Sequence, residues 1–123
     1  EIADRDWSSD VCSSDLFQFY DPIAKILFSG DMGASMVDDA NKPLENFASH
    51  IPKMKSFHQR YMCCNKIIRL WVKMVRTMDV EMIVPQHGTP FIGKEQVNQF
   101  LDWIETLECG TDLMDESVFT CPT

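Results

Sequence analysis

Two short stretches of the sequence place potential metal ligands directly after apolar runs. The stretch "FSGDMGAS" carries Asp31, and "IVPQHGTPF" carries His87. Each apolar run is typical of a short strand that is buried on both faces. Carboxylate and imidazole groups bind metal ions, and loops at the carboxyl ends of strands are where α/β proteins place their ligand-binding groups. We therefore expect Asp31 and His87 to converge at one edge of one sheet, within about 6 Å of each other, as half of a metal site.

The elements that must position these two residues follow from the spacing of apolar side chains. Short apolar or alternating runs that stop at turn residues predict three strands. They fall near residues 17–20, 25–29 and 81–85. Residues 33–56 show no period and are expected to be irregular, as is the loop at 86–93.

Two helices are predicted from apolar residues that recur at steps of three and four. The first covers residues 57–78, where the apolar positions run from Tyr61 to Met78. The second covers residues 94–108. Its apolar positions are Val97, Phe100, Leu101, Ile104 and Leu107. The order of strands and helices predicts an α/β layer structure.

The first sixteen residues do not fit this pattern. The stretch "DWSSDVCSSDL", residues 6–16, resembles the translation of a sequencing-adapter oligonucleotide, and residues 1–5 fit the same oligonucleotide. Segments of this kind are excluded from fold reasoning. We therefore expect residues 1–16 to be non-native, with Trp7 outside the main core, and residues 17–123 to be part of one domain whose N-terminal portion is absent.

The composition of residues 17–123 excludes some partners. These residues hold 10 basic and 14 acidic side chains, a net charge of −4. Mild acidity argues against a nucleic-acid partner, because phosphate binding needs a basic surface. No apolar run approaches the roughly 18 residues of a transmembrane helix, so no membrane association is expected. Four cysteines without a CxxC spacing favour reduced thiols and a cytoplasmic location.

Three stretches of the chain resemble a known family. They are "FQFYDPIAKILFSGDMGAS", "RYMCCNKIIRLW" and "PQHGTPFIGKEQVNQFLDWIETLECGTDLM". They are similar to the oxygen-binding di-iron proteins, close relatives of the catalytic domain of flavodiiron proteins. The resemblance runs from Phe17 to about Met114. It implies that residues 17–123 form the C-terminal half of a metallo-β-lactamase-like αββα sandwich.

The resemblance also assigns metal ligands. The family pattern is H-x-E-x-D-H, then a His, a bridging Asp and a last His. Asp31 matches the bridging Asp, and His87 matches the last His. The third His of the family falls at Cys12, and the first motif is expected further upstream. The chain therefore carries two of about six ligands for two non-haem iron ions. No separate catalytic residue and no FMN domain are assigned to it.

The resemblance implies a fragment of a non-haem di-iron domain of the flavodiiron type. Such a domain binds dioxygen, or reduces dioxygen or nitric oxide, with a redox or signalling protein as partner, and the intact protein is expected to be a homo-oligomer. Two alternatives stay open. One is a di-zinc hydrolase of the same fold, which would have a His in place of the Glu in the upstream motif. The other is a dioxygen-sensing signalling domain.

Other polar residues are weaker candidates for the site. His58 matches a helix start near the site in the family, but it is more typical of a helix-face His that its neighbours satisfy. Arg60, Tyr61 and Asn65 match the "RYM…N" segment and could orient metal ligands. Core packing is an equal explanation for Tyr61. His50 is expected in a loop, without a functional role.

Overall fold

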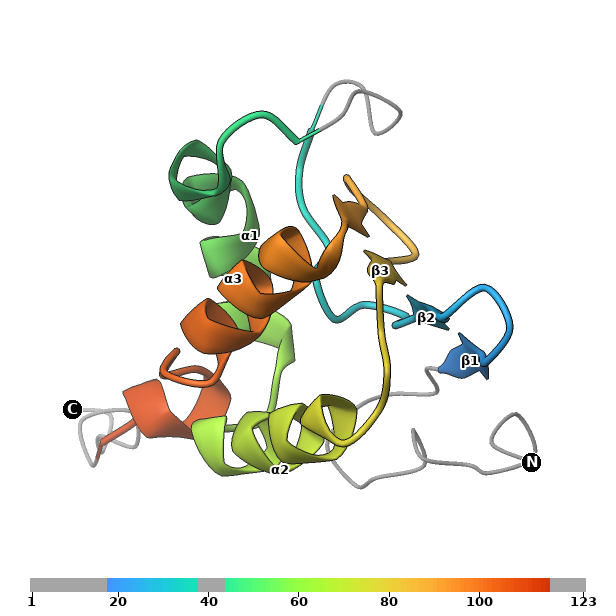
Figure 1. The fold of residues 1–123 in the computed structure, drawn as a ribbon. Helices are drawn as coiled ribbons and strands as arrows, with labels where there is room; N and C mark the ends of the chain where they lie inside the picture. The colour runs from blue at the N-terminus through green and yellow to red at the C-terminus, as the bar shows by residue number, and fades with distance from the viewer. Residues whose placement is uncertain (1–17, 38–43, 116–123) are drawn as a thin grey trace, which may run out of the picture.

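The computed structural model describes residues 18–37 and 44–115 (Figure 1). Trp7 and Cys12 lie outside the described residues. The prediction that residues 1–16 are non-native therefore stays a prediction.

The described residues contain a four-stranded sheet. Its strands are β1 (Phe19–Asp21), β2 (Ile26–Phe28), β3 (Met82–Val84) and β4 (Phe91–Ile92), in the order β1-β2-β3-β4. The two outer pairs are antiparallel, whereas β2 and β3 are parallel. The three predicted strands are confirmed. The prediction of a loop at 86–93 was wrong at β4, because a two-residue strand is too short to show an alternating pattern.

Three α-helices and a short 3-10 helix accompany the sheet. They are α1 (Phe47–Tyr61), α2 (Asn65–Arg76), α3 (Lys94–Ile104) and η2 (Gly110–Leu113). Figure 1 shows the three α-helices gathered on one side of the strands. The helix predicted at 94–108 is confirmed, although it ends four residues earlier. The single helix predicted over 57–78 was wrong, because α1 begins ten residues before it and the chain leaves the helix between α1 and α2.

Local capping and tertiary contacts explain this difference. The side chain of Asn46 accepts hydrogen bonds from the backbone N–H groups of Ala48 and Ser49, which starts α1. Pro52 lies inside α1. The helix was not predicted at this position, because a proline inside a helix removes a backbone hydrogen-bond donor and argues against helical structure. After α1, the carbonyl of Cys63 accepts a hydrogen bond from the backbone of Thr111. This long-range contact holds the chain out of helical geometry.

The core lies between the sheet and the helices. One residue from each strand is buried there: Tyr20, Leu27, Ile83 and Phe91. All five apolar residues predicted for the second helix pattern are buried as well. The outer face of the sheet carries other apolar side chains, and Phe19, Phe28 and Ile92 are 38–49% exposed on it. One covered and one apolar uncovered face is the arrangement expected of half of an αββα sandwich.

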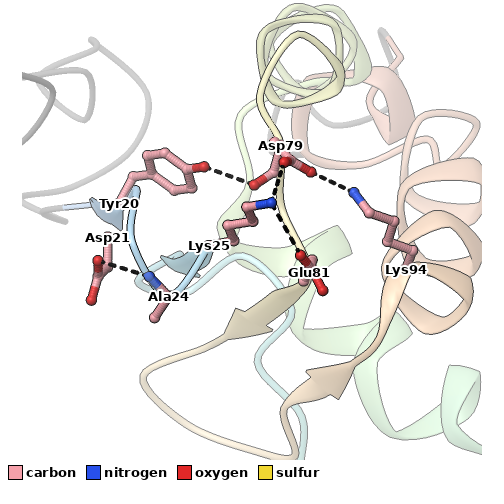
Figure 2. Close-up of polar contacts among 7 residues, drawn as sticks. All are labelled: Tyr20, Asp21, Ala24, Lys25, Asp79, Glu81 and Lys94. Carbon is pink, nitrogen blue, oxygen red and sulfur yellow. Dashed lines mark hydrogen bonds and ion pairs between the residues drawn. The ribbon is translucent and has the colours of Figure 1, made fainter.

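A cluster of charged side chains lies at the amino end of β2 and β3. The Nζ atom of Lys25 is 2.8 Å from Oδ2 of Asp79 and 3.5 Å from Oε2 of Glu81. Lys94 reaches Oδ1 of Asp79 at 2.6 Å, and the Tyr20 hydroxyl donates to the Asp79 carbonyl (Figure 2). The paired lysines lower the pKa of Asp79 to about 2. Ion pairs this exposed contribute little to stability, and they lie at the sheet end opposite Asp31 and His87.

Two further expectations concern the cysteines and the membrane. Cys64 and Cys109 are free thiols, but Cys63 is disulfide-bonded, so the expectation of reduced thiols was wrong at Cys63. Burial and the nearby Asp112 raise the pKa of Cys109 to about 11. In the part of the chain that the structure describes, no helix is long and apolar enough to cross a membrane.

Candidate functional site

The sheet register brings Asp31 and His87 to the same edge. Phe28 is paired with Val84 across the parallel strands β2 and β3. Asp31 follows Phe28 by three residues, and His87 follows Val84 by three residues. The segment 29–36 is called the Asp31 loop and the segment 85–90 the His87 loop. Both loops leave the carboxyl end of the sheet, where α/β proteins bind their ligands.

Three hydrogen bonds join these two loops, and a fourth joins Ser29 of the Asp31 loop to Val84 at the end of β3. They are Ser29 N to Val84 O at 3.1 Å, Gln86 N to Gly30 O at 2.6 Å, Ser35 N to His87 O at 3.1 Å and Thr89 N to Ser35 Oγ at 3.3 Å. Three of them join backbone groups, so they depend on loop conformation more than on side-chain identity. The contact between the loops is therefore part of the backbone architecture.

The two loops carry the two predicted metal ligands. Asp31 is partly buried and His87 is exposed. Among the described residues, no group of three or more His, Cys, Asp or Glu side chains could hold a metal ion. The assignment of Asp31 and His87 as metal ligands stays a prediction. The predicted convergence of the two side chains within about 6 Å stays a prediction.

His58 is confirmed as a helix-face histidine whose neighbours satisfy both ring nitrogens, and one of these neighbours is Gly33 of the Asp31 loop. It lies on α1, is fully buried, and its Nε2 atom accepts a hydrogen bond from the Gly33 N–H at 2.9 Å. Because a backbone N–H can only donate, Nε2 is unprotonated and Nδ1 carries the hydrogen. That hydrogen is donated to the Met54 carbonyl at 2.8 Å. Burial lowers the pKa of His58 to about 4, so the ring is neutral near pH 7.

His50 is also placed differently from the prediction. It was expected in a loop, but it lies on α1 and is 2% exposed. Its ring meets Phe91 edge to face, with 6.0 Å between the ring centroids. Burial lowers the pKa of His50, and its Nε2 atom has no hydrogen-bond partner among the described residues. The loop was predicted because Pro52, two residues later, argues against a helix.

The "RYM…N" segment has a structural role. Tyr61 is 59% exposed, so of the two explanations for this residue, packing in the core is wrong. Its ring packs against Phe57 at the surface, with Arg60 above it at 5.7 Å. Asn65 donates from Nδ2 to the carbonyls of Glu105 and Leu107, at 2.9 and 2.8 Å. It thus joins the start of α2 to the end of α3.

Replacing Asn65 with alanine tests that role. We expect the free energy of unfolding to fall by about 1–3 kcal/mol, because two partly buried carbonyls lose their donor. Urea denaturation measures this change. The exposed Asn98 on α3 is the matched control, and Asn98→Ala should change stability by less than about 0.5 kcal/mol. Equal effects of the two substitutions would contradict the role of Asn65.

Comparison with known proteins gives one family and seven matching chains of solved structures. Residues 11–88 match the family described as "ODP family beta lactamase", and this range contains both Asp31 and His87. The match begins inside the segment predicted to be non-native, and that boundary stays a prediction. Curated proteins give no match to the chain.

Two of these structures are of a chemotaxis sensor. The structure described as the peroxy diiron species of chemotaxis sensor ODP is 48% identical, covers 84% of this chain and has a TM-score of 0.76. The apo state of chemotaxis sensor ODP from T. denticola is 47% identical over 84% of this chain, with a TM-score of 0.74. The chain spans 44% and 43% of these two chains, which is less than half of their length.

Proposed function

Because this chain belongs to the ODP family of β-lactamase-like proteins, we propose that it forms part of a domain that senses dioxygen with two non-haem iron ions. The observation that carries the proposal is the 48% identity with the chemotaxis sensor ODP, one of whose structures contains a peroxy diiron species. Dioxygen would be the ligand of the intact domain. A signalling protein would be its partner, and we further propose a homo-oligomer in the cytoplasm.

The sheet edge supports the assignment of two ligands. Asp31 would bridge the two iron ions, since one carboxylate can bind two metal ions about 3.5 Å apart. His87 would bind one of them through an imidazole nitrogen. Mixed carboxylate and imidazole ligands are typical of non-haem iron sites. When bound, iron would supply the dioxygen-binding chemistry. The hydrogen bonds between the two loops would fix the distance between Asp31 and His87.

The likeness to a sensor favours signalling over the other candidate functions. A flavodiiron-type reductase of dioxygen or nitric oxide remains the second candidate, because it would use the same two ligand types. It differs in needing an electron donor. Dioxygen consumption with turnover would indicate reduction, whereas reversible binding without turnover would indicate sensing. Hydrolysis of an ester or β-lactam with zinc would indicate the di-zinc hydrolase instead.

A hybrid protein tests the proposed function. Residues 17–123 would be joined behind the part of the T. denticola sensor that this chain does not span. We expect the purified hybrid to retain two equivalents of iron, as the intact site would, and to change its absorption spectrum on exposure to dioxygen. Asp31→Asn and His87→Ala should each abolish the second equivalent. A folded hybrid that retains no iron would refute the proposed function.

The chain on its own should not bind two metal ions tightly. Two ligands are too few for a stable di-iron centre, which uses about six. Metal analysis after gel filtration should find well below one equivalent of iron per chain. Two retained equivalents would show that ligands outside Asp31 and His87 exist in this chain, and would overturn the assignment of residues 1–16 as non-native.

A further inference from the structure

The Asp31 loop is fixed by more than its contact with the His87 loop. Its carbonyl at Asp31 accepts a hydrogen bond from the Ala34 N–H at 3.0 Å, which closes a tight turn. Gly33 lies inside this turn with φ +95. A Cβ atom at Gly33 would lie 2.8 Å from the Phe91 ring, so the turn fits tightly against β4. The backbone N–H of Gly33 donates to Nε2 of His58 on α1.

The His58 ring is held in one orientation by its surroundings. Nδ1 is anchored to the Met54 carbonyl one helical turn earlier. The rings of Phe57 and Trp103 meet His58 nearly edge to face, with centroids 5.6 and 6.0 Å away. An acceptor held in this way has little freedom to follow a moving loop. The Nε2 atom therefore fixes the position of the Gly33 N–H, and through the turn it also fixes the position of Asp31.

We propose that His58 is a positioning residue that sets the direction of the Asp31 carboxylate by fixing the turn from Asp31 to Ala34 through the Gly33 N–H. The inference rests on the proposed function only in treating Asp31 as the metal ligand. His58 itself touches no metal in this scheme. A second contact supports the same coupling, since the Met36 N–H donates to the Lys53 carbonyl of α1 at 3.0 Å.

Two variants of His58 separate positioning from packing. His58→Gln places a side-chain oxygen near the position of Nε2 and keeps an acceptor for the Gly33 N–H. His58→Leu keeps apolar volume but has no acceptor. A residue that only fills the core would tolerate leucine at least as well as glutamine. A positioning residue requires the acceptor, so the glutamine variant should be the better replacement at the loop.

Amide hydrogen exchange in the full chain measures the loop directly and needs no metal. The Ser29 N–H, bonded to the Val84 carbonyl, is the reference for overall stability. We expect His58→Leu to accelerate exchange at Gly33 about tenfold more than at Ser29, and His58→Gln to do so less than about threefold. Parallel changes at Gly33 and Ser29 in both variants would overturn the proposal.

A measurement on the unmodified chain keeps the proposal testable if a variant does not fold. Nitrogen-15 NMR at neutral pH should show His58 with hydrogen on Nδ1 and an acceptor nitrogen at Nε2. Hydrogen on Nε2 would overturn the proposal, because that nitrogen could not accept from Gly33.

Binding of cobalt(II) tests whether the turn affects the ability of Asp31 to bind a metal ion. In the unmodified chain, Co²⁺ should broaden the NMR signals of Asp31 and His87 at a weak shared site. His58→Leu should weaken this binding about tenfold, with recovery in His58→Gln, as for other residues that orient metal ligands. Equal binding in all three proteins would overturn the proposal. Absence of broadening in the unmodified chain would instead count against the proposed function, while the exchange result at Gly33 would still decide the role of His58 in the turn.

Discussion

Substituting Gly88 with alanine is expected to lower the free energy of unfolding by about 3–5 kcal/mol. Gly88 adopts φ +110, and a Cβ atom there would lie 2.3 Å from Oγ and 2.6 Å from the backbone nitrogen of Ser35. Ser35 carries two of the hydrogen bonds between the Asp31 loop and the His87 loop. The added methyl group must therefore strain the backbone and also push the two loops apart. Urea denaturation gives the change in stability.

Gly93→Ala is the matched control for this prediction. Gly93 also has a positive φ, +89, but a Cβ atom there would meet nothing within 4 Å. Its substitution should cost only the backbone strain, about 1–3 kcal/mol. The difference between the two variants then isolates the clash between the loops. If Gly93→Ala destabilised the protein as much as Gly88→Ala, the close approach of the loops would not be the cause.

Acidification should destabilise the protein between pH 6.5 and about 4 through His58. Its pKa falls from the ordinary 6.5 to about 4 in the folded protein, chiefly because the ring is buried. Between these values the unfolded chain binds a proton that the folded chain does not, so stability rises with pH in this window. The contribution is fully present above pH 6.5 and is lost once pH has fallen through about 4. Its size is about 3 kcal/mol.

The comparison with His58→Gln isolates this proton from others that titrate in acid. Free energies of unfolding would be measured at several pH values for both proteins. The slope for the unmodified chain should exceed that for His58→Gln by nearly one proton in the middle of the window. His50 also has a lowered pKa, so His50→Gln is a second control that should leave most of the slope. Equal slopes for the unmodified chain and His58→Gln would show that His58 is not buried in neutral form.

The parts of the fold that local sequence patterns control were predictable. The strands β1, β2 and β3 lie where short apolar runs end at turn residues, and α3 lies under an uninterrupted apolar stripe. The start of α1 was not predictable from periodicity, because Pro52 interrupts its pattern. The break between α1 and α2 depends on the contact of Cys63 with Thr111, which are 48 residues apart. Contacts of this kind leave no local signal.

Some residues of the candidate site were predictable from the sequence, and others were not. Asp31 and His87 could be placed at one sheet edge because each follows a strand, and the pairing of Phe28 with Val84 puts those strand ends together. The role of His58 could not be read from the sequence, since it depends on a hydrogen bond to Gly33, 25 residues away. The role of Asn65 in joining the start of α2 to the end of α3 was not predictable either, because its partners lie 40 and 42 residues away. The spacing could have indicated that His58 is buried, because it lies one turn after Met54 and two turns after His50 on α1.

The parallel pairing of β2 and β3 has a consequence for folding kinetics. Leu27 pairs with Ile83, so both α1 and α2 lie within the loop that this pairing closes. Closing so long a loop costs chain entropy before any contact between the strands repays it. Pairings of this range raise the contact order and slow folding. The sheet edge that joins Asp31 to His87 should therefore form late, after the local helices and the β1–β2 hairpin. During synthesis, the ribosome must release residues beyond β3 before these two residues can meet.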